Sequence, residues 1–463
     1  MYLDVLNRDT NVRYEVISMH SPVHLPKEIK KSVAIVLIGN FLDFFDLLLA
    51  VHLTVVLSAI FIPPNSSSKV LLTTFMFCSS FCIRPLAALF WGYIGDTIGR
   101  VPVLISTTFL MSISCLIIPN IPPYAEWGIL SAILFLFMRL VQGFASGGEC
   151  IAADVFITET VPKPKVYFCS ALVEATCSLG GLVACGIGAL CLFLSPENGW
   201  KIPFYIGSGV AVLGTIARKT LKETPEFLKT LHSKIEKRKA SDVYKTISYK
   251  NRNIPALFAM YFFPAVQFYF CLAYLPSVLI NQLGIAANYV MAQTTLVLFI
   301  IMCAEVGYGI LGLRFHPFHI ARFKLIAALF AILAMVFFYT QHTVLSIFIV
   351  QVIIGVLGQG LTPYAPIINK SFPVFGRYTN LLFVWAFSHS LMYLFTAYVC
   401  ENVTSFYGLG ALLFGSALIS LIGLYTFIPN DKRDQLQEDN DHTDFIETKQ
   451  KVREVKKWLE KAI

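Results

Sequence analysis

The sequence predicts an all-α membrane protein whose twelve transmembrane helices form two six-helix bundles. Its 463 residues are 56% hydrophobic and only 14% charged, with a mean hydropathy of +0.68, whereas a soluble domain carries about 25% charged residues. Apolar runs recur along the chain, and roughly 20 apolar residues are enough to span a bilayer core as a helix. Lipid cannot hydrogen-bond a bare backbone, so each run is expected to be helical.

The apolar runs fall into two groups of six, joined mostly by short polar turns. The N-terminal bundle is predicted over 32–221 and the C-terminal bundle over 254–428. The first six spans are expected at 32–58, 70–94, 101–119, 128–154, 167–194 and 202–221. The second six are expected at 254–280, 289–313, 323–340, 343–366, 379–399 and 407–428.

Basic residues predict the orientation of the chain, because cytoplasmic loops of membrane proteins are rich in Lys and Arg. With the N-terminal segment 1–31 in the cytoplasm, segment 222–253 becomes a basic cytoplasmic linker, and the inside also receives Arg218 and Lys324. An even number of spans returns the charged tail 429–463 to the cytoplasm. The net charge of +8 therefore follows from topology in the cell inner (plasma) membrane, and no nucleic-acid partner is expected.

The charged tail carries a short heptad pattern. Phe445, Val452, Val455 and Leu459 fall at a and d positions of a possible helix. Such a helix could pair with a second copy of the chain, or it could lie on the membrane surface with its apolar side in the lipid. Both interpretations stay open from the sequence.

A glycine-rich loop between the second and third spans carries the first family motif. Gly92, Asp96, Gly99 and Arg100 match the G-x-x-x-D-x-x-G-R signature and resemble the major facilitator superfamily. Further matching stretches lie at 139–149, 199–204 and 223–227. Together these motifs resemble the metabolite:H+ symporter family, which holds proline/betaine, α-ketoglutarate, citrate and shikimate transporters.

The resemblance implies a secondary transporter with a substrate site near the midplane between two bundles. It also implies that Gly92, Asp96, Gly99 and Arg100 form a cytoplasmic gate, with Asp96 facing a helix N-terminus, where the helix dipole favours negative charge. A static turn is the alternative. Thr97 stands where the family usually has a basic residue, so a weaker latch is expected. The proton gradient would drive transport, and no cofactor or metal is expected.

Acidic residues inside the predicted spans are candidates for proton coupling, because a charge in the membrane is costly and such residues are usually functional. Asp43 and Asp46 lie three residues apart and share a helix face, and Glu174 lies in the fifth span. A carboxylate can exchange a proton when burial and a nearby arginine oppose each other. The alternative is a fixed ion pair with Arg84 or Arg139.

Candidate substrate contacts come from both halves of the chain. Arginine offers a planar fork of donors that suits a carboxylate, and an aromatic ring can hold a quaternary ammonium. In the fourth span, Arg139, Gln142, Ser146 and Glu149 share one polar stripe. The substrate-binding candidates are Asn40, Arg84, Arg139, Gln142, Gln267, Tyr269, Trp385 and His389. Alternatively, the arginines only neutralise the acids, and the histidine is structural.

The function classes follow from these features. The sequence has no H-x-x-x-x-D or H-E-x-x-H motif and no metal-spaced histidine set, so an enzyme is not expected. We expect a proton-coupled symporter of a small zwitterion, with a proline/betaine-like compound favoured. A symporter of dicarboxylates, tricarboxylates or shikimate-type organic anions is one alternative, and a membrane sensor that has lost transport is another. The expected partners are a small-molecule substrate, protons and the lipid bilayer.

Overall fold

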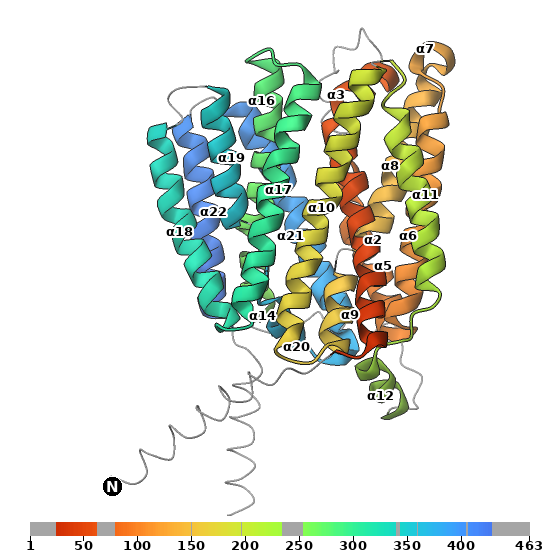
Figure 1. Cartoon of the computed structure of the whole chain (residues 1–463), viewed down its shortest axis with the longest axis vertical. Helices are drawn as coiled ribbons and strands as arrows, with labels where there is room; N and C mark the ends of the chain where they lie inside the picture. Colours follow the sequence, from red (N-terminus) through yellow and green to blue (C-terminus); the bar gives the residue numbers. More distant parts are fainter. Residues whose placement is uncertain are drawn as a thin grey trace, which may run out of the picture.

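A computed structural model describes residues 25–62, 79–149, 151–195, 197–233, 253–338, 343–358, 360–403 and 406–427. These residues form helices joined by turns (Figure 1). Most of the predicted N-terminal segment, most of the basic linker and the whole of the tail 429–463 lie outside the described residues. The heptad pattern and the predicted self-association of the tail fall there too.

The helices of the first half begin at the described N-terminus and end after the sixth predicted span. They are α2 Lys27–His52, α3 Thr54–Phe61, α5 Arg84–Thr97, α6 Arg100–Ile117, the 3₁₀ turn η1 Ile118–Asn120, α7 Tyr124–Trp127, α8 Ile129–Glu149, α9 Ala152–Thr160, α10 Lys165–Leu194, α11 Lys201–Arg218 and α12 Pro225–Ser233. The α12 end of the molecule also carries α9 and α20 (Figure 1).

The helices of the second half include one interrupted span, in which a π-helical turn joins α15 to α16. They are α14 Asn253–Met260, α15 Phe262–Tyr269, η2 Phe270–Tyr274, α16 Leu275–Asn281, α17 Ala287–Gly312, α18 Pro317–Phe338, α19 Val344–Gly358, α20 Ala365–Lys370, α21 Val374–Asn402 and α22 Phe406–Thr426.

Nine helical stretches of the described chain are long and apolar enough to cross a membrane. They are Lys27–His52, Arg100–Asn120, Ile129–Thr160, Lys165–Leu194, Asn253–Asn281, Ala287–Gly312, Pro317–Met335, Val374–Cys400 and Tyr407–Thr426. Three other predicted spans coincide with α5, α11 and α19, of which α19 is a shorter apolar helix. The count of twelve spans therefore stays a prediction.

Polarity is distributed as expected for a protein surrounded by lipid. Large apolar side chains such as Phe323 and Phe330 are each 70% exposed, whereas Arg100 and Arg218 are fully buried. An exposed apolar surface of this kind is unfavourable in water and favourable in lipid. Charged groups of the helices are therefore held where other helices can pair with them.

Two long contacts join helices from opposite halves of the chain. Helix α10 packs along α17 as well as along α2, and α5 packs along α21; α10 and α17 lie side by side in Figure 1. Gly180 of α10 permits the close approach to α2, because an added Cβ there would clash with the Phe41 carbonyl oxygen. These contacts place residues of α2, α5, α10 and α21 around the same interior space.

Candidate functional site

Asp46, Gln142 and Arg139 form a buried polar cluster between α2 and α8. The Gln142 amide donates to Asp46 Oδ1 at 2.6 Å, and Arg139 Nη1 donates to the Gln142 Oε1 at 2.7 Å. Arg139 Nη1 also lies 3.8 Å from Asp46 Oδ2, and the Cys115 thiol donates to Asp46 Oδ1 at 3.2 Å. The glutamine thus connects an acid to a base inside the membrane-spanning part of the protein.

Asp43 and Arg84 line the same small pocket as this cluster. We call it the arginine pocket, and it is lined by Asp43, Asp46, Leu47, Ser80, Arg84, Met111, Arg139, Gln142, Gly143 and Ser146. The Arg84 guanidinium lies over two rings, 4.6 Å from the Phe81 centroid and 5.5 Å from the Trp385 centroid. The four predicted charges Asp43, Asp46, Arg84 and Arg139 are therefore brought together.

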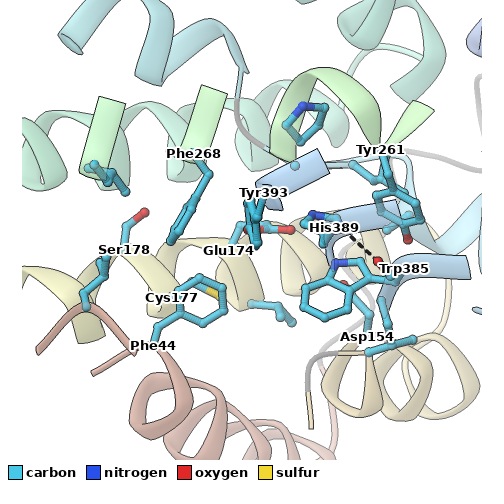
Figure 2. A pocket seen from close by; sticks show the side chains of 18 of the residues that line it. Phe44, Asp154, Glu174, Cys177, Ser178, Tyr261, Phe268, Trp385, His389 and Tyr393 are labelled. Atoms are coloured by element: carbon cyan, nitrogen blue, oxygen red, sulfur yellow. Dashed lines mark hydrogen bonds between the residues drawn. The ribbon is translucent and has the colours of Figure 1, made fainter. Parts of the chain in front are cut away.

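A larger cavity lies beside the arginine pocket, with Trp385 between them. This central cavity has a volume of about 90 Å³, several times the roughly 10–15 Å³ that one water needs. Its polar and aromatic lining is Phe44, Asp154, Glu174, Cys177, Ser178, Tyr261, Phe268, Asn369, Trp385, His389 and Tyr393. Figure 2 shows Phe44, Phe268, Trp385 and Tyr393 gathered around the space with Glu174 and Asp154.

The predicted site residues divide between these two cavities and the helix interior. Glu174, Trp385 and His389 line the central cavity. Asn40 instead joins α2 to α10, because its amide donates to the Val173 carbonyl oxygen at 2.7 Å. Gln267 packs against Gly358 of α19. None of Asn40, Gln267 and Tyr269 is among the described residues that line either cavity.

Several lining residues were missed by the reasoning from sequence. Asp154 sat at the predicted end of the fourth span, but α9 continues to Thr160 and places Asp154 inside a helix. Its carboxylate accepts a hydrogen bond from Ser170 at 2.8 Å. Tyr261, Asn369 and Tyr393 carried no distinguishing signal among the many aromatic and polar residues of the second half.

A further buried charge cluster lies at the edge of the central cavity. Lys324 is 3% exposed and Glu305 is 1% exposed, so the prediction that Lys324 belongs to an inside turn is wrong. The Lys324 amine interacts electrostatically with Glu305 and with Glu174. It also lies 4.6 Å from the Tyr308 ring centroid. The lysine is buried because α18 begins at Pro317, about two turns before it.

Glu149, the last residue of the predicted polar stripe, is buried as expected but faces α11 rather than the arginine pocket. It pairs with Arg218 of α11 and accepts a hydrogen bond from Thr107 at 2.8 Å. Arg218 also donates to the Leu104 carbonyl oxygen at 2.7 Å. Arg218 is fully buried, so its assignment to the basic cytoplasmic segment is corrected: it serves as the internal partner of a membrane-embedded acid.

The motif loop joins the two halves of the chain at the α12 end. Asp96 accepts hydrogen bonds from the Tyr378 backbone N at 3.3 Å and from the Thr379 backbone N and hydroxyl at 2.9 and 2.7 Å. These amides belong to the first turn after Gly376 of α21, where φ is 89° and the helix is interrupted. Asp96 therefore caps a helix N-terminus contributed by the other half, as the resemblance implied.

Arg100 and Arg377 complete this latch, which we define as Asp96, Arg100, Glu159, Arg377, Tyr378 and Thr379. Arg100 Nη2 and Arg377 Nη1 each lie 3.0 Å from Glu159 Oε1. Gly92 and Gly95 let α5 approach closely, since added Cβ atoms would meet Thr379 and the Tyr378 ring. Position 97, where the family usually has a basic residue, is a threonine here. The second cation that pairs with Glu159 is instead Arg377, from the other half of the chain.

The described residues contain no group of three or more His, Cys, Asp or Glu side chains that could hold a metal ion. The described residues that line the cavities bring together acids, arginines and aromatic rings, with Lys324 in a neighbouring pocket. Such a set can exchange protons, form ion pairs and hold a small polar molecule.

Comparison with known proteins supports this picture of the molecule. Residues 35–388 match the family profile described as the Major Facilitator Superfamily. A putative proline/betaine transporter of Staphylococcus aureus (strain COL) is 30% identical over 358 residues, which cover 75% of each chain. The proline/betaine transporter of Salmonella typhimurium is 28% identical over 358 residues, covering 74% of this chain and 69% of the relative.

Among solved structures, the proton:xylose symporter XylE bound to 6-bromo-6-deoxy-D-glucose superposes with a TM-score of 0.70 at 17% identity, covering 87% of this chain and 96% of that one. A partially occluded inward-open form of XylE from E. coli gives a TM-score of 0.67 at 15% identity, covering 87% of this chain and 100% of that one. At these identities the likeness concerns the fold alone.

Proposed function

The chain belongs to the major facilitator superfamily, and from that premise we propose that it is a proton-coupled symporter of a small zwitterion, with a proline/betaine-like compound favoured. The family makes it a multi-pass membrane transporter and not an enzyme. The named relatives are proline/betaine transporters, and this supports the choice of cargo.

One observation carries the proposal. Asp43, Asp46, Arg84 and Arg139, which come from α2, α5 and α8, line one pocket, and Arg84 contacts Trp385 of the central cavity. Holding four charged groups inside the membrane is costly, so their convergence beside a cavity indicates function rather than accident. An ion and a cargo can then influence each other through Arg84 and Trp385.

In the proposed mechanism, Asp46 carries the coupling proton. When Asp46 is ionised, it holds Arg139 at 3.8 Å and accepts from Gln142 at 2.6 Å. Protonation of an Asp46 oxygen removes the negative charge, weakens the ion pair and frees Arg139 to interact elsewhere. Asp43 and Glu174 are the other candidate proton carriers, and each lines one of the two cavities.

Alternating access would follow from two six-helix bundles, 32–221 and 254–428, rocking about the site. The latch supports this proposal because its hydrogen bonds connect α5 to α21 at one end of the molecule only. We assign this end to the cytoplasm. Twelve spans would return the tail to the same side as the N-terminus. Because the latch stabilises only the closed α12 end, the free energy of opening would differ between the two ends, and this difference would decide which conformation is favoured without substrate.

Uptake by proteoliposomes with an imposed pH gradient tests the function. The wild-type chain should accumulate labelled proline or glycine betaine above equilibrium, and a protonophore should abolish accumulation. Asp46→Asn should reduce gradient-driven accumulation by about tenfold or more, a loss of about 1.4 kcal/mol of coupling, while substrate exchange without a gradient persists. Glu126→Gln, which changes an exposed acid, is the control and should behave as wild type.

The same assay separates the other functions. Accumulation of citrate or α-ketoglutarate in place of the zwitterions would establish the organic-anion alternative. Neither accumulation nor exchange of any of these compounds would favour a sensor that has lost transport. If Asp46→Asn and Asp43→Asn both accumulate substrate in response to the pH gradient as the wild type does, the assignment of the proton to the arginine pocket is refuted.

A further inference from the structure

We propose that the central cavity selects its cargo by positive charge, so that organic cations without a carboxylate bind there as well as a zwitterion does. This rests on the proposed function, because it concerns the cargo site of the same transporter. It goes further by making the carboxylate of the cargo dispensable for recognition.

The balance of charge differs between the two cavities. The arginine pocket has two acids, Asp43 and Asp46, and two arginines, Arg84 and Arg139, so its formal charges cancel. The central cavity is lined by Asp154 and Glu174, and none of its described lining residues is a lysine or an arginine. An excess of acid in a buried site favours a cationic ligand, which supplies the missing charge.

Lys324 is a buried cation that interacts with two of the acids and is already engaged, whereas Arg84 lies in the arginine pocket with its guanidinium 5.5 Å from the Trp385 ring centroid. Lys324 lines a neighbouring small pocket that shares only Pro264 and Gly360 with the central cavity. Its amine interacts electrostatically with Glu305 and Glu174 and lies 3.5 Å from the Thr362 carbonyl oxygen. One lysine against Asp154, Glu174 and Glu305 still leaves the surroundings of the cavity acidic.

Aromatic rings form the rest of the cavity wall. Trp385 and His389 stack at 4.4 Å between ring centroids, and Phe268 lies 5.5 Å from Tyr393. The face of an aromatic ring attracts a cation, and a desolvated site strengthens that attraction. Trp385, the best ring type for this interaction, lines the cavity together with Asp154 and Glu174 (Figure 2).

His389 adds a hydrogen-bond acceptor to the same wall. Its Nδ1 lies 2.9 Å from the Trp385 carbonyl oxygen, and since a carbonyl can only accept, Nδ1 carries the proton. The neutral ring then has a lone pair on Nε2, and the side chain is only 6% exposed. A trimethylammonium group has no N–H to donate, so the two carboxylates and this lone pair attract the positive pole of such a cargo electrostatically.

A carboxylate on the cargo would find weaker partners. The hydroxyl, amide and indole donors that line the cavity are neutral, namely Ser178, Tyr261, Asn369, Trp385 and Tyr393. These donors can hydrogen-bond a carboxylate, but they supply no positive charge to balance it, and Asp154 and Glu174 repel it. The positive pole therefore contributes most of the recognition, and a dicarboxylate or tricarboxylate would bring several negative charges against Asp154 and Glu174.

Direct binding to the purified full-length chain in lipid nanodiscs tests the inference without requiring proton coupling. Four probes form two matched pairs: glycine betaine against 3,3-dimethylbutanoate, and choline against 3,3-dimethyl-1-butanol. Each pair exchanges the trimethylammonium group for a neutral tert-butyl group of the same shape. We expect choline and glycine betaine to bind within about tenfold of each other and both tert-butyl compounds to bind at least tenfold more weakly.

Variants of the acids then locate the binding site. Glu174→Gln should weaken choline binding by about tenfold or more, and Asp154→Asn should weaken it in the same direction. Glu126→Gln changes an exposed acid and should leave the affinity unchanged. If one cavity variant fails to fold, as judged by its thermal unfolding, the other still tests the site.

The outcomes separate this inference from the proposed function. If 3,3-dimethylbutanoate binds as tightly as glycine betaine while choline does not bind, the carboxylate decides recognition, and the inference falls while zwitterion transport stands. If choline binds and Glu174→Gln and Asp154→Asn bind it unchanged, the cation lies elsewhere and the inference also falls. If none of the four probes binds, the assignment of a betaine-like cargo fails.

Discussion

At the scale of single residues, the interior of this protein is organised by pairs of buried charges. Helical spacing correctly indicated that Arg139, Gln142, Ser146 and Glu149 point inward from α8. It could not indicate which neighbour each would meet, because that depends on packing between helices. Arg139 and Gln142 meet Asp46 across the bundle, whereas Glu149 meets Arg218 near the end of α11.

Removal of one member of the Glu149–Arg218 pair should destabilise the protein strongly. Arg218→Met leaves Glu149 as an uncompensated buried acid, and breaking a buried pair in this way costs about 3–5 kcal/mol. The double variant Glu149→Gln/Arg218→Met should recover much of this loss, because no buried charge is then left alone. Chemical unfolding in detergent micelles measures both effects.

Lys222→Met is the matched control, because this exposed lysine lies just beyond the same helix and should unfold as wild type does. A double variant that is as unstable as the sum of the two single variants would contradict the paired arrangement, since independent sites add and coupled sites do not.

At the scale of elements, the interrupted start of α21 explains how a loop motif becomes a latch. Gly376 takes a positive φ of 89°, so the chain turns and the amides of Tyr378 and Thr379 point to Asp96. The motif residues could be predicted from the sequence, because their spacing is distinctive. Their partners could not, since residues 96 and 379 are far apart in the chain and no local pattern pairs these donors with Asp96.

Asp96→Ala should shift the molecule towards the form that is open at the α12 end. The substitution removes three hydrogen bonds to a carboxylate, each worth about 1.5–3 kcal/mol when one partner is charged. The population of the open form should rise about tenfold or more. Pulsed electron spin resonance between non-cysteine labels at Ile98 and Phe315, both exposed, reports the opening as a longer distance.

Lys222→Gln provides the comparison for this experiment. Its ion pair with Glu28 is 88% and 86% exposed, and such surface pairs contribute little, so the distance distribution should stay as in the wild type. A distribution that is equally unchanged in Asp96→Ala would mean that the hydrogen bonds of Asp96 do not hold this end closed.

At the scale of the whole molecule, the apolar runs of the sequence predicted an all-helical membrane protein, and its motifs resembled the family to which the chain belongs. The apolar runs also predicted where most helices lie, because a bilayer demands runs of a fixed length. The central cavity was harder to predict, as its wall combines residues of α2, α9, α10, α15, α17, α20 and α21. Asp154 and Lys324 were not predicted to be buried, because the predicted spans ended at Asp154 and began next to Lys324. The helices extend further, to Thr160 and back to Pro317.

The convergence of charges is the property on which the proposed transport mechanism depends. Asp43, Asp46, Arg84 and Arg139 could be singled out from the sequence because each stands in an apolar run, and all four line one pocket. Glu305 and Lys324 show that the second half contributes buried charges of its own. Lys324 interacts with Glu174 of the first half as well as with Glu305 of the second, so electrostatic interactions link the two halves.

Proton flux that accompanies substrate entry tests this mechanism most directly. Proteoliposomes that hold a pH-sensitive dye, with no gradient imposed, are mixed with glycine betaine, and the acidification of the lumen is recorded. The wild-type chain should acidify the lumen in proportion to the substrate that enters, and Asp46→Asn should admit substrate with at least about tenfold less acidification. Substrate entry without any change of lumenal pH in the wild type would contradict proton coupling at these buried charges.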